Sequence, residues 1–146
     1  MRYVARTHME GRRTLIEFPD CLGCQTFAEP RDDIESVARE ALESWLEAGL
    51  KYGEAPPRPR LGRGKRRDRL EVRLEPTHAV RLQMRWARLD KGLSQGQLAK
   101  LVGVTRQQIS LLESPDANLT LGTLEKVASA LAMDLEIELQ PRPTAA

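Results

Sequence analysis

The spacing of apolar residues changes several times along this chain, and each change marks the boundary of a predicted element. Residues 1–28 contain short β-rich runs separated by turn residues, a pattern that predicts three strands. These strands cover Arg2–Thr7, Thr14–Phe18 and Gln25–Ala28. From Ile34 to Leu46 the apolar residues recur at steps of three and four, which predicts an amphipathic helix that ends at Gly49 or Gly53.

A basic stretch rich in Pro and Gly follows this helix. Residues 54–68 contain three Pro, two Gly and a cluster of Arg and Lys, which is typical of an exposed linker or a long loop. In residues 69–74 apolar and charged side chains alternate, so we expect a strand that returns to the sheet of the first domain. Residues 134–139 (DLEIEL) alternate in the same way and predict one last strand.

Helical periodicity between these two alternating segments predicts four helices. They cover His78–Lys91, Gln95–Val102, Thr105–Glu113 and Thr120–Ala132. Their ends fall at residues with suitable chemistry, because Gly favours a helix stop and a hydroxyl side chain favours a start. The expected stops are Gly92 and Gly103, and the expected caps are Ser94, Thr105 and either Thr120 or Thr123.

These elements predict an α+β chain made of two small domains. The first is an α/β domain over residues 1–75, which includes the basic loop 54–68. The second is an all-α domain over residues 76–140, and residues 141–146 form a flexible tail. A chain of 146 residues is long enough for this arrangement.

Charge is distributed unevenly over these segments. Residues 1–53 carry 7 basic and 10 acidic residues, whereas residues 54–75 carry 8 and 4, and residues 76–146 carry 8 and 7. The net charges are therefore −3, +4 and +1. The basic middle segment is attracted to nucleic acid, and Arg66 and Arg67 are candidates for phosphate contacts.

The strongest motif lies in Gly92–Glu113, where two short helices meet at a tight turn. A small residue, a glycine and an apolar plug allow this close approach, and Ala99, Gly103 and Val104 have the required spacing. The small core between the helices is closed by Leu98, Val102, Ile109 and Leu112. This geometry directs the start of the second helix outward, where it can enter a major groove of DNA.

The exposed start of that second helix carries side chains that can read bases. Arg can bind guanine and Gln can bind adenine through paired hydrogen bonds. Gln95, at the start of the preceding helix, can anchor a phosphate. The predicted DNA-binding residues are Gln95, Thr105, Arg106, Gln107, Gln108 and Ser110.

This segment resembles the helix-turn-helix family of the lambda-type repressors and Cro proteins. The matching residues are Leu93, Ser94, Gln95, Leu98, Ala99, Gly103, Val104, Thr105, Ile109, Ser110, Glu113, Leu124, Val127, Ala128, Ala130 and Leu131. The resemblance implies that Arg106, Gln107 and Ser110 contact bases, and that double-stranded operator DNA is bound by a homodimer or a higher homo-oligomer. Leu111 departs from the family pattern, in which this position is usually polar.

The first domain contains the phrase Phe18-Pro19-Asp20 followed by Gly23-Cys24, then an acidic helix and Pro57 and Pro59. This combination resembles the HicB antitoxin family. The resemblance implies a partial ribonuclease-H-like domain that binds a small HicA-like ribonuclease toxin, and a DNA-binding domain that represses the shared operon. The alternative is a stand-alone transcriptional regulator whose first domain binds another protein or an effector. The acidic helix face can also be only a solvated surface.

Catalysis, metal binding and membrane insertion have little support in these residues. Cys21 and Cys24 form a lone C-x-x-C without a second ligand pair, so we expect no metal and no cofactor. Few carboxylates lie on the predicted strands and no catalytic set of residues is evident, so we expect no enzyme and no catalytic residues. No apolar run approaches the length of a membrane span, which favours a cytoplasmic protein with reduced cysteines.

One apolar stripe has two possible roles. Leu82, Trp86 and Leu89 recur at steps of four and three beside the core stripe of the first helix in the second domain. An exposed stripe that carries a Trp is typical of an interface between copies of a protein. The alternative is that the stripe packs against the linker or the final strand.

Overall fold

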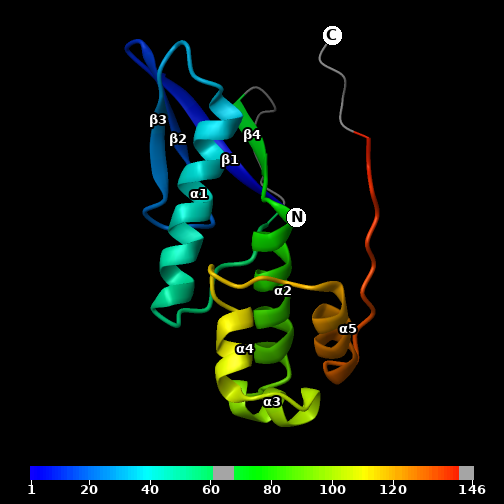
Figure 1. The fold of residues 1–146 in the computed structure, drawn as a ribbon. Helices are drawn as coiled ribbons and strands as arrows, with labels where there is room; N and C mark the ends of the chain where they lie inside the picture. The colour runs from blue at the N-terminus through cyan, green and yellow to red at the C-terminus, as the bar shows by residue number, and fades with distance from the viewer. Residues whose placement is uncertain (61–67, 142–146) are drawn as a thin grey trace.

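A computed structural model describes residues 1–60 and 68–141 of the chain. A sheet with one helix across it lies at one end of the molecule, and a group of short helices lies at the other end (Figure 1). A single helix, α2 (Pro76–Asp90), runs between the two ends. The described chain is therefore an α+β protein, as the alternating patterns predict.

The sheet is antiparallel throughout. Its strands are β1 (Arg2–Glu10), β2 (Arg13–Glu17), β3 (Gln25–Ala28) and β4 (Arg69–Arg73), in the order β3-β2-β1-β4. The β1–β2 hairpin turns at Gly11, which has a φ of +63° that glycine adopts without strain. The fourth strand returns to the sheet beside β1, which confirms the prediction from its alternation.

Helix α1 (Ile34–Lys51) covers one face of the sheet. Its apolar stripe is buried there, through Ala38, Leu42, Leu46 and Leu50. Its first turn is closed at Asp33, whose carboxylate accepts a 2.6 Å hydrogen bond from the Ser36 hydroxyl. Of the two predicted stops, Gly53 is the one with a left-handed φ, of +76°, directly after the helix.

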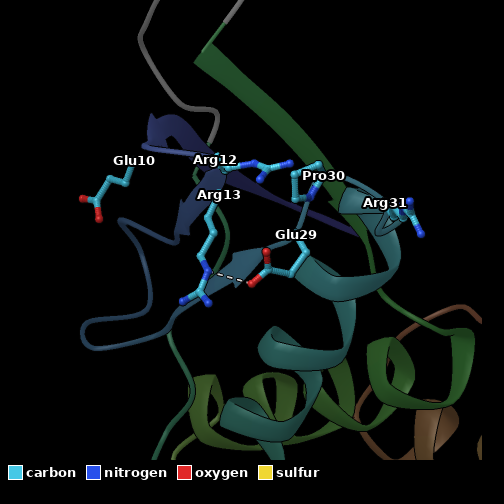
Figure 2. Close-up of a pocket in the computed structure, with 6 residues that line it drawn as sticks. All are labelled: Glu10, Arg12, Arg13, Glu29, Pro30 and Arg31. Atoms are coloured by element: carbon cyan, nitrogen blue, oxygen red, sulfur yellow. Dashed lines mark ion pairs between the residues drawn. The ribbon is translucent and has the colours of Figure 1, made fainter.

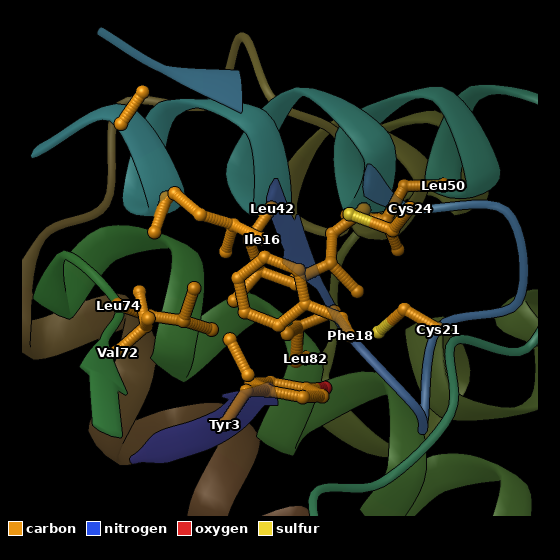
Figure 3. Packing of buried hydrophobic residues seen from close by; sticks show 14 of the residues in the cluster. Tyr3, Ile16, Phe18, Cys21, Cys24, Leu42, Leu50, Val72, Leu74 and Leu82 are labelled. Carbon is orange, nitrogen blue, oxygen red and sulfur yellow. The ribbon is translucent and has the colours of Figure 1, made fainter. Parts of the chain in front are cut away.

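The core under α1 also includes side chains from α2 (Figure 3). Leu82 and Trp86 of α2 pack with buried residues of the sheet such as Tyr3 and Val72. Met84 of the same helix belongs instead to the core of the helical group. Helix α2 is therefore buried on two sides, and it ties the sheet to the helices that follow it.

The described part of the basic loop, residues 54–60, packs on α2 although the sequence predicts an exposed linker. Pro56 is buried, and its carbonyl accepts a 2.8 Å hydrogen bond from Trp86 Nε1. The guanidinium of Arg58 lies 5.4 Å from the centre of the Trp86 ring and pairs with Asp90. Leu82 and Trp86 of the predicted stripe are therefore packing residues, and the indole N–H of Trp86 is bound in the interior, whereas Leu89 of the same stripe is 40% exposed.

The phrase from Phe18 to Cys24 forms a tight loop that buries both cysteines. Three backbone bonds of 2.8 to 3.0 Å close it, of which Phe18 N to Cys24 O is the longest. Burial raises the pKa of the Cys21 thiol to about 12 and that of Cys24 to about 11. Both side chains are free thiols that serve as apolar core residues in this fold.

The remaining helices are α3 (Gln95–Val102), α4 (Arg106–Leu112) and α5 (Leu121–Ala130). The predicted bounds agree with these to within two residues, and Thr120 is the cap of α5. None of the helices in the described ranges is long and apolar enough to cross a membrane.

The predicted last strand does not form. Residues 133–140 are extended but lie in no sheet, and Ile137 and Leu139 are 59% and 95% exposed. The prediction was wrong because alternation gives a segment two different faces but provides no neighbouring strand for its backbone to pair with. Arg66 and Arg67, and the tail beyond Pro141, lie outside the described residues.

We predict that Trp86→Ala lowers the free energy of unfolding by about 3 kcal/mol, as is usual when a buried Trp is truncated. Leu89→Ala, on the same helix but 40% exposed, is the matched control and should cost less than about 1 kcal/mol. Urea denaturation followed by circular dichroism measures both. Equal losses in the two variants would contradict the packing of α2 against the sheet.

Candidate DNA-binding interface

Helices α3 and α4 each begin at a reciprocal capping box. Ser94 Oγ accepts a 3.1 Å bond from Gln97 N, while Gln97 Oε1 accepts a 2.8 Å bond from Ser94 N. Thr105 and Gln108 make the same pair of bonds at the start of α4, at 3.2 and 2.8 Å. Each box satisfies two backbone N–H groups that a helix start leaves free, which fixes where the helix begins.

The turn between these helices depends on a glycine. Gly103 ends α3 with a φ of +80°, a conformation that other residues rarely adopt. Its N–H and that of Val104 both donate to the carbonyl of Ala99, at 2.9 and 3.0 Å. Small Ala99 is buried directly under this turn, so the spacing of the three residues confirms the turn predicted from the sequence.

A compact core holds the helices in place. Leu98 and Ile109 are each 1% exposed and meet buried side chains of α5 and α2. Val102, Val104 and Leu112 pack against this core and are partly buried. All of the residues predicted to close the space between the two helices therefore do so.

A buried ion pair that the sequence did not reveal connects α2 to the end of α4. Arg88 and Glu113 are 6% and 3% exposed, and two bonds of 2.6 and 2.9 Å join the guanidinium to the carboxylate. Arg88 also donates to the carbonyl of Leu93, and Gln95 Nε2 donates to the same carboxylate at 3.1 Å. One charged cluster thus orients four segments of the domain.

The signal for this pair was the spacing of three arginines. Arg81, Arg85 and Arg88 recur at steps of four and three, so they share one face of α2, and all three are buried. Arg81 donates a 2.7 Å bond to the carbonyl of Ala117, and burial lowers the pKa of Arg81 and Arg85. A polar stripe between two apolar stripes therefore indicates buried arginines in this helix and not a solvated face.

Five of the six predicted DNA-binding residues lie together on α4 and its cap, and all five are exposed. The side chains of Arg106, Gln107 and Ser110 make no hydrogen bond or ion pair with other described residues, so their polar groups are available to a ligand. Thr105 and Gln108 are occupied in the capping box. These positions leave the base-reading roles predicted for Arg106, Gln107 and Ser110 physically possible.

The sixth residue, Gln95, lies next to this group and is half-buried. It lines a surface hollow together with Ser94, Gly96, Arg88 and Arg106. Because its side-chain amide already donates to Glu113, the group available to a phosphate is the backbone N–H at the start of α3. Leu111, which departs from the family pattern, is 55% exposed on α4 and can contact only an apolar group such as the methyl of thymine.

Comparison with known proteins agrees with this geometry. Residues 84–137 match the model of a helix-turn-helix family, a range that runs from the second half of α2 to beyond α5. The C-terminal part of the chain is a helix-turn-helix domain, which supports a DNA-binding transcription regulator. A comparison with curated proteins gave no match.

The described residues contain no candidate metal site. In the two described ranges, no group of three or more His, Cys, Asp or Glu side chains has an arrangement that could hold a metal ion.

We predict that Glu113→Ala lowers the free energy of unfolding by about 3–5 kcal/mol, because it leaves the charge of Arg88 buried without a partner. Replacing both partners, as Arg88→Met with Glu113→Leu, should recover most of the lost free energy of unfolding. Thermal and urea unfolding of both variants measure these changes. The control is Glu125→Ala on the exposed side of α5, and a loss no larger than the control's would mean that the pair does not hold the domain together.

Proposed function

We propose that this protein is the antitoxin of a type II toxin–antitoxin pair and the repressor of its own operon. In this proposal the helix-turn-helix domain binds operator DNA as a dimer, and the first domain, related to HicB antitoxins, neutralises a small HicA-like ribonuclease by binding it. The protein acts in the cytoplasm without a cofactor, a metal or catalysis of its own. The observation that carries the DNA-binding half is the exposed, unpaired Arg106 and Gln107 at the capped start of α4.

Sequence preference follows from the chemistry of that helix start. Arg106 can bind the O6 and N7 atoms of guanine, and Gln107 can bind the N6 and N7 atoms of adenine. The capping boxes and the Arg88–Glu113 pair hold α4 rigidly, so little ordering is needed when DNA binds. Proteins with this motif usually bind operators that consist of two half-sites, one for each copy of the protein. The proposal therefore includes a dimer.

We predict that Arg106→Ala together with Gln107→Ala abolishes the preference for the operator, since each base contact contributes about 1–3 kcal/mol to discrimination. The probe is a duplex from directly upstream of this protein's own reading frame, titrated against a shuffled duplex at fixed salt. Arg12→Ala together with Gln25→Ala removes the same two residue types from the first domain and should leave the preference unchanged. Retained discrimination in the α4 variant would refute the base-reading assignment.

One side of the first domain carries an excess of acidic side chains, and this favours a basic protein partner. A hollow there, between α1 and the start of α2, is lined by Glu40, Glu43, Glu47, Glu75, Ser36, Ser44, Arg39 and His78. The sheet face that α1 does not cover is mixed, because the strand register places five arginines and three glutamates on it: Arg2, Arg6, Arg13, Arg69, Arg73, Glu10, Glu17 and Glu71.

That hollow is held by a network of polar contacts. Glu43 accepts a 2.7 Å bond from the backbone N–H of Glu75, and His78 lies 3.4 Å from Glu47. Arg39 bridges Glu35 and Glu75 along its edge. Glu40 is exposed and makes no side-chain hydrogen bond or ion pair with another described residue, so its charge faces solvent. A ribonuclease that binds RNA presents a basic surface, for which this side is electrostatically complementary.

We predict that the product of the short reading frame next to this gene is toxic alone and co-purifies with the tagged chain. Glu40→Lys should weaken that complex and slow its association at low salt, because an exposed like charge opposes the approach of the basic partner. Glu125→Lys makes the same change of charge on α5 and serves as the control. A harmless neighbour, or a complex that both substitutions affect equally, would contradict the antitoxin assignment.

A stand-alone regulator is the second candidate, and one surface feature favours it. A hollow at the tip of the β1–β2 hairpin is lined by Arg12, Arg13 and Arg31 with Glu10, Glu29 and Pro30 (Figure 2). Arg13 pairs with Glu29 at 2.6 Å, and Arg12 and Arg31 form no ion pair with any residue that the structure describes. The excess positive charge fits a small anionic effector. If the neighbouring frame is harmless, this hollow becomes the place to look for the ligand of the first domain.

A further inference from the structure

We propose that the sheet face that α1 does not cover binds single-stranded RNA, with bases stacked on Phe27 and His8 and phosphates bound by arginines. This is a second nucleic-acid-binding activity, separate from the reading of DNA by α4. The proposal does not depend on the antitoxin assignment, because it rests on the side chains that the strand register brings together on one face.

This face of the sheet is open. The helices that pack on the sheet do so from the other side, where Tyr3 and Ile16 lie in one core with residues of α1 and α2. Side chains alternate along a strand, so Val4 and Leu15 project to the opposite face. Figure 1 shows α3, α4 and α5 at the far end of the molecule. No helix of the described chain therefore covers this face.

Two ring side chains lie on the open face in one row across three strands. His8 of β1 is opposite Leu15 of β2, and Leu15 is opposite Phe27 of β3. Phe27 is 44% exposed and the His8 side chain is 51% exposed, whereas Leu15 between them is buried. Because neighbouring strands are about 4.8 Å apart, the rings are about 10 Å apart, and each can stack with a different base. A single strand is the fitting ligand, since the bases of a duplex stack on one another.

The charges around this row favour a ligand with phosphates. The face carries five arginines and three glutamates, so positive charge is in excess. Arg6 and Arg73 are exposed, and their side chains form no hydrogen bond or ion pair with any residue that the structure describes. Their guanidinium groups are therefore free to bind phosphate oxygens.

One of the glutamates favours RNA over single-stranded DNA. Glu17 is directly opposite Arg6 in the β1–β2 register, yet its carboxylate forms no ion pair or hydrogen bond within the described ranges. A carboxylate repels phosphate but accepts a hydrogen bond from a hydroxyl group. RNA carries a 2′-hydroxyl on each nucleotide and DNA does not. Arg6 and Glu17 side by side therefore fit a phosphate and the ribose next to it.

The direct experiment measures the fluorescence anisotropy of a labelled RNA of about 12 nucleotides, of mixed sequence and without a hairpin, with the full-length chain. Phe27→Ala should weaken binding about five- to 150-fold, the usual range when an aromatic partner of a stacked base is removed. Phe27→Tyr keeps a ring and should bind as the unmodified chain does. Circular dichroism should be unchanged in both variants, because Phe27 lies outside the two cores.

The phosphate contacts have a separate readout. Arg6→Ala together with Arg73→Ala should reduce the slope of log K against log salt concentration by about 1.4, as expected when two phosphate contacts to a single strand are lost. Lys51→Ala together with Lys126→Ala removes two exposed positive charges from α1 and α5 and is the matched control. This control should leave the slope unchanged.

RNA binding and operator preference should respond to different substitutions. Phe27→Ala should leave the operator preference intact, and Arg106→Ala with Gln107→Ala should leave RNA binding intact. DNA of the same sequence, and the duplex form of the RNA, should bind more weakly than the single-stranded RNA.

Four outcomes would overturn the proposal. These are no RNA binding at about 100 μM protein, the weak limit of non-specific nucleic-acid binding, unchanged affinity in Phe27→Ala, equal binding of RNA and DNA, and loss of RNA binding in the α4 variant. The last result would place the RNA on the helix-turn-helix. None of these readouts uses an operator or a toxin, so their failure is distinguishable from failure of the proposed function.

Discussion

The structure depends on the burial of α2 on two sides. One stripe of this helix completes the core under α1, a second stripe completes the core of the helix-turn-helix, and buried arginines lie along a third. Because a packed interior deforms little, the sheet and the DNA-reading helix have a fixed relative position. Under the proposed function, a partner bound to the first domain would therefore meet the DNA-bound half in a defined geometry.

Local signals predicted most of the elements. Capping residues act within three positions and apolar stripes within four, so Ser94, Thr105 and the stripe of α1 could be identified from the sequence. The signal from Ala99, Gly103 and Val104 is equally local. This is why the turn and the exposed position of the α4 residues agree with the prediction. The tertiary roles could not be found in this way, because the partner of Trp86 lies 30 residues away and that of Arg88 lies 25 residues away.

The last segment shows the opposite limit. Residues 134–139 have the alternation of a strand, yet a strand is defined by its neighbour and not by its own sequence. The same holds for charge: residues 1–75 carry 15 basic and 14 acidic residues, so their net charge does not predict the acidic hollow between α1 and the start of α2.

The most direct test of the central claim, that this chain reads DNA sequence through α4, is selection of binding sites from a random pool of duplex DNA by the full-length protein. The account predicts an enriched inverted repeat with half-sites whose centres lie about one helical turn, or roughly 10 base pairs, apart or a multiple of that spacing. Selected pools that contain no shared sequence, or that bind in proportion to phosphate charge alone, would contradict it.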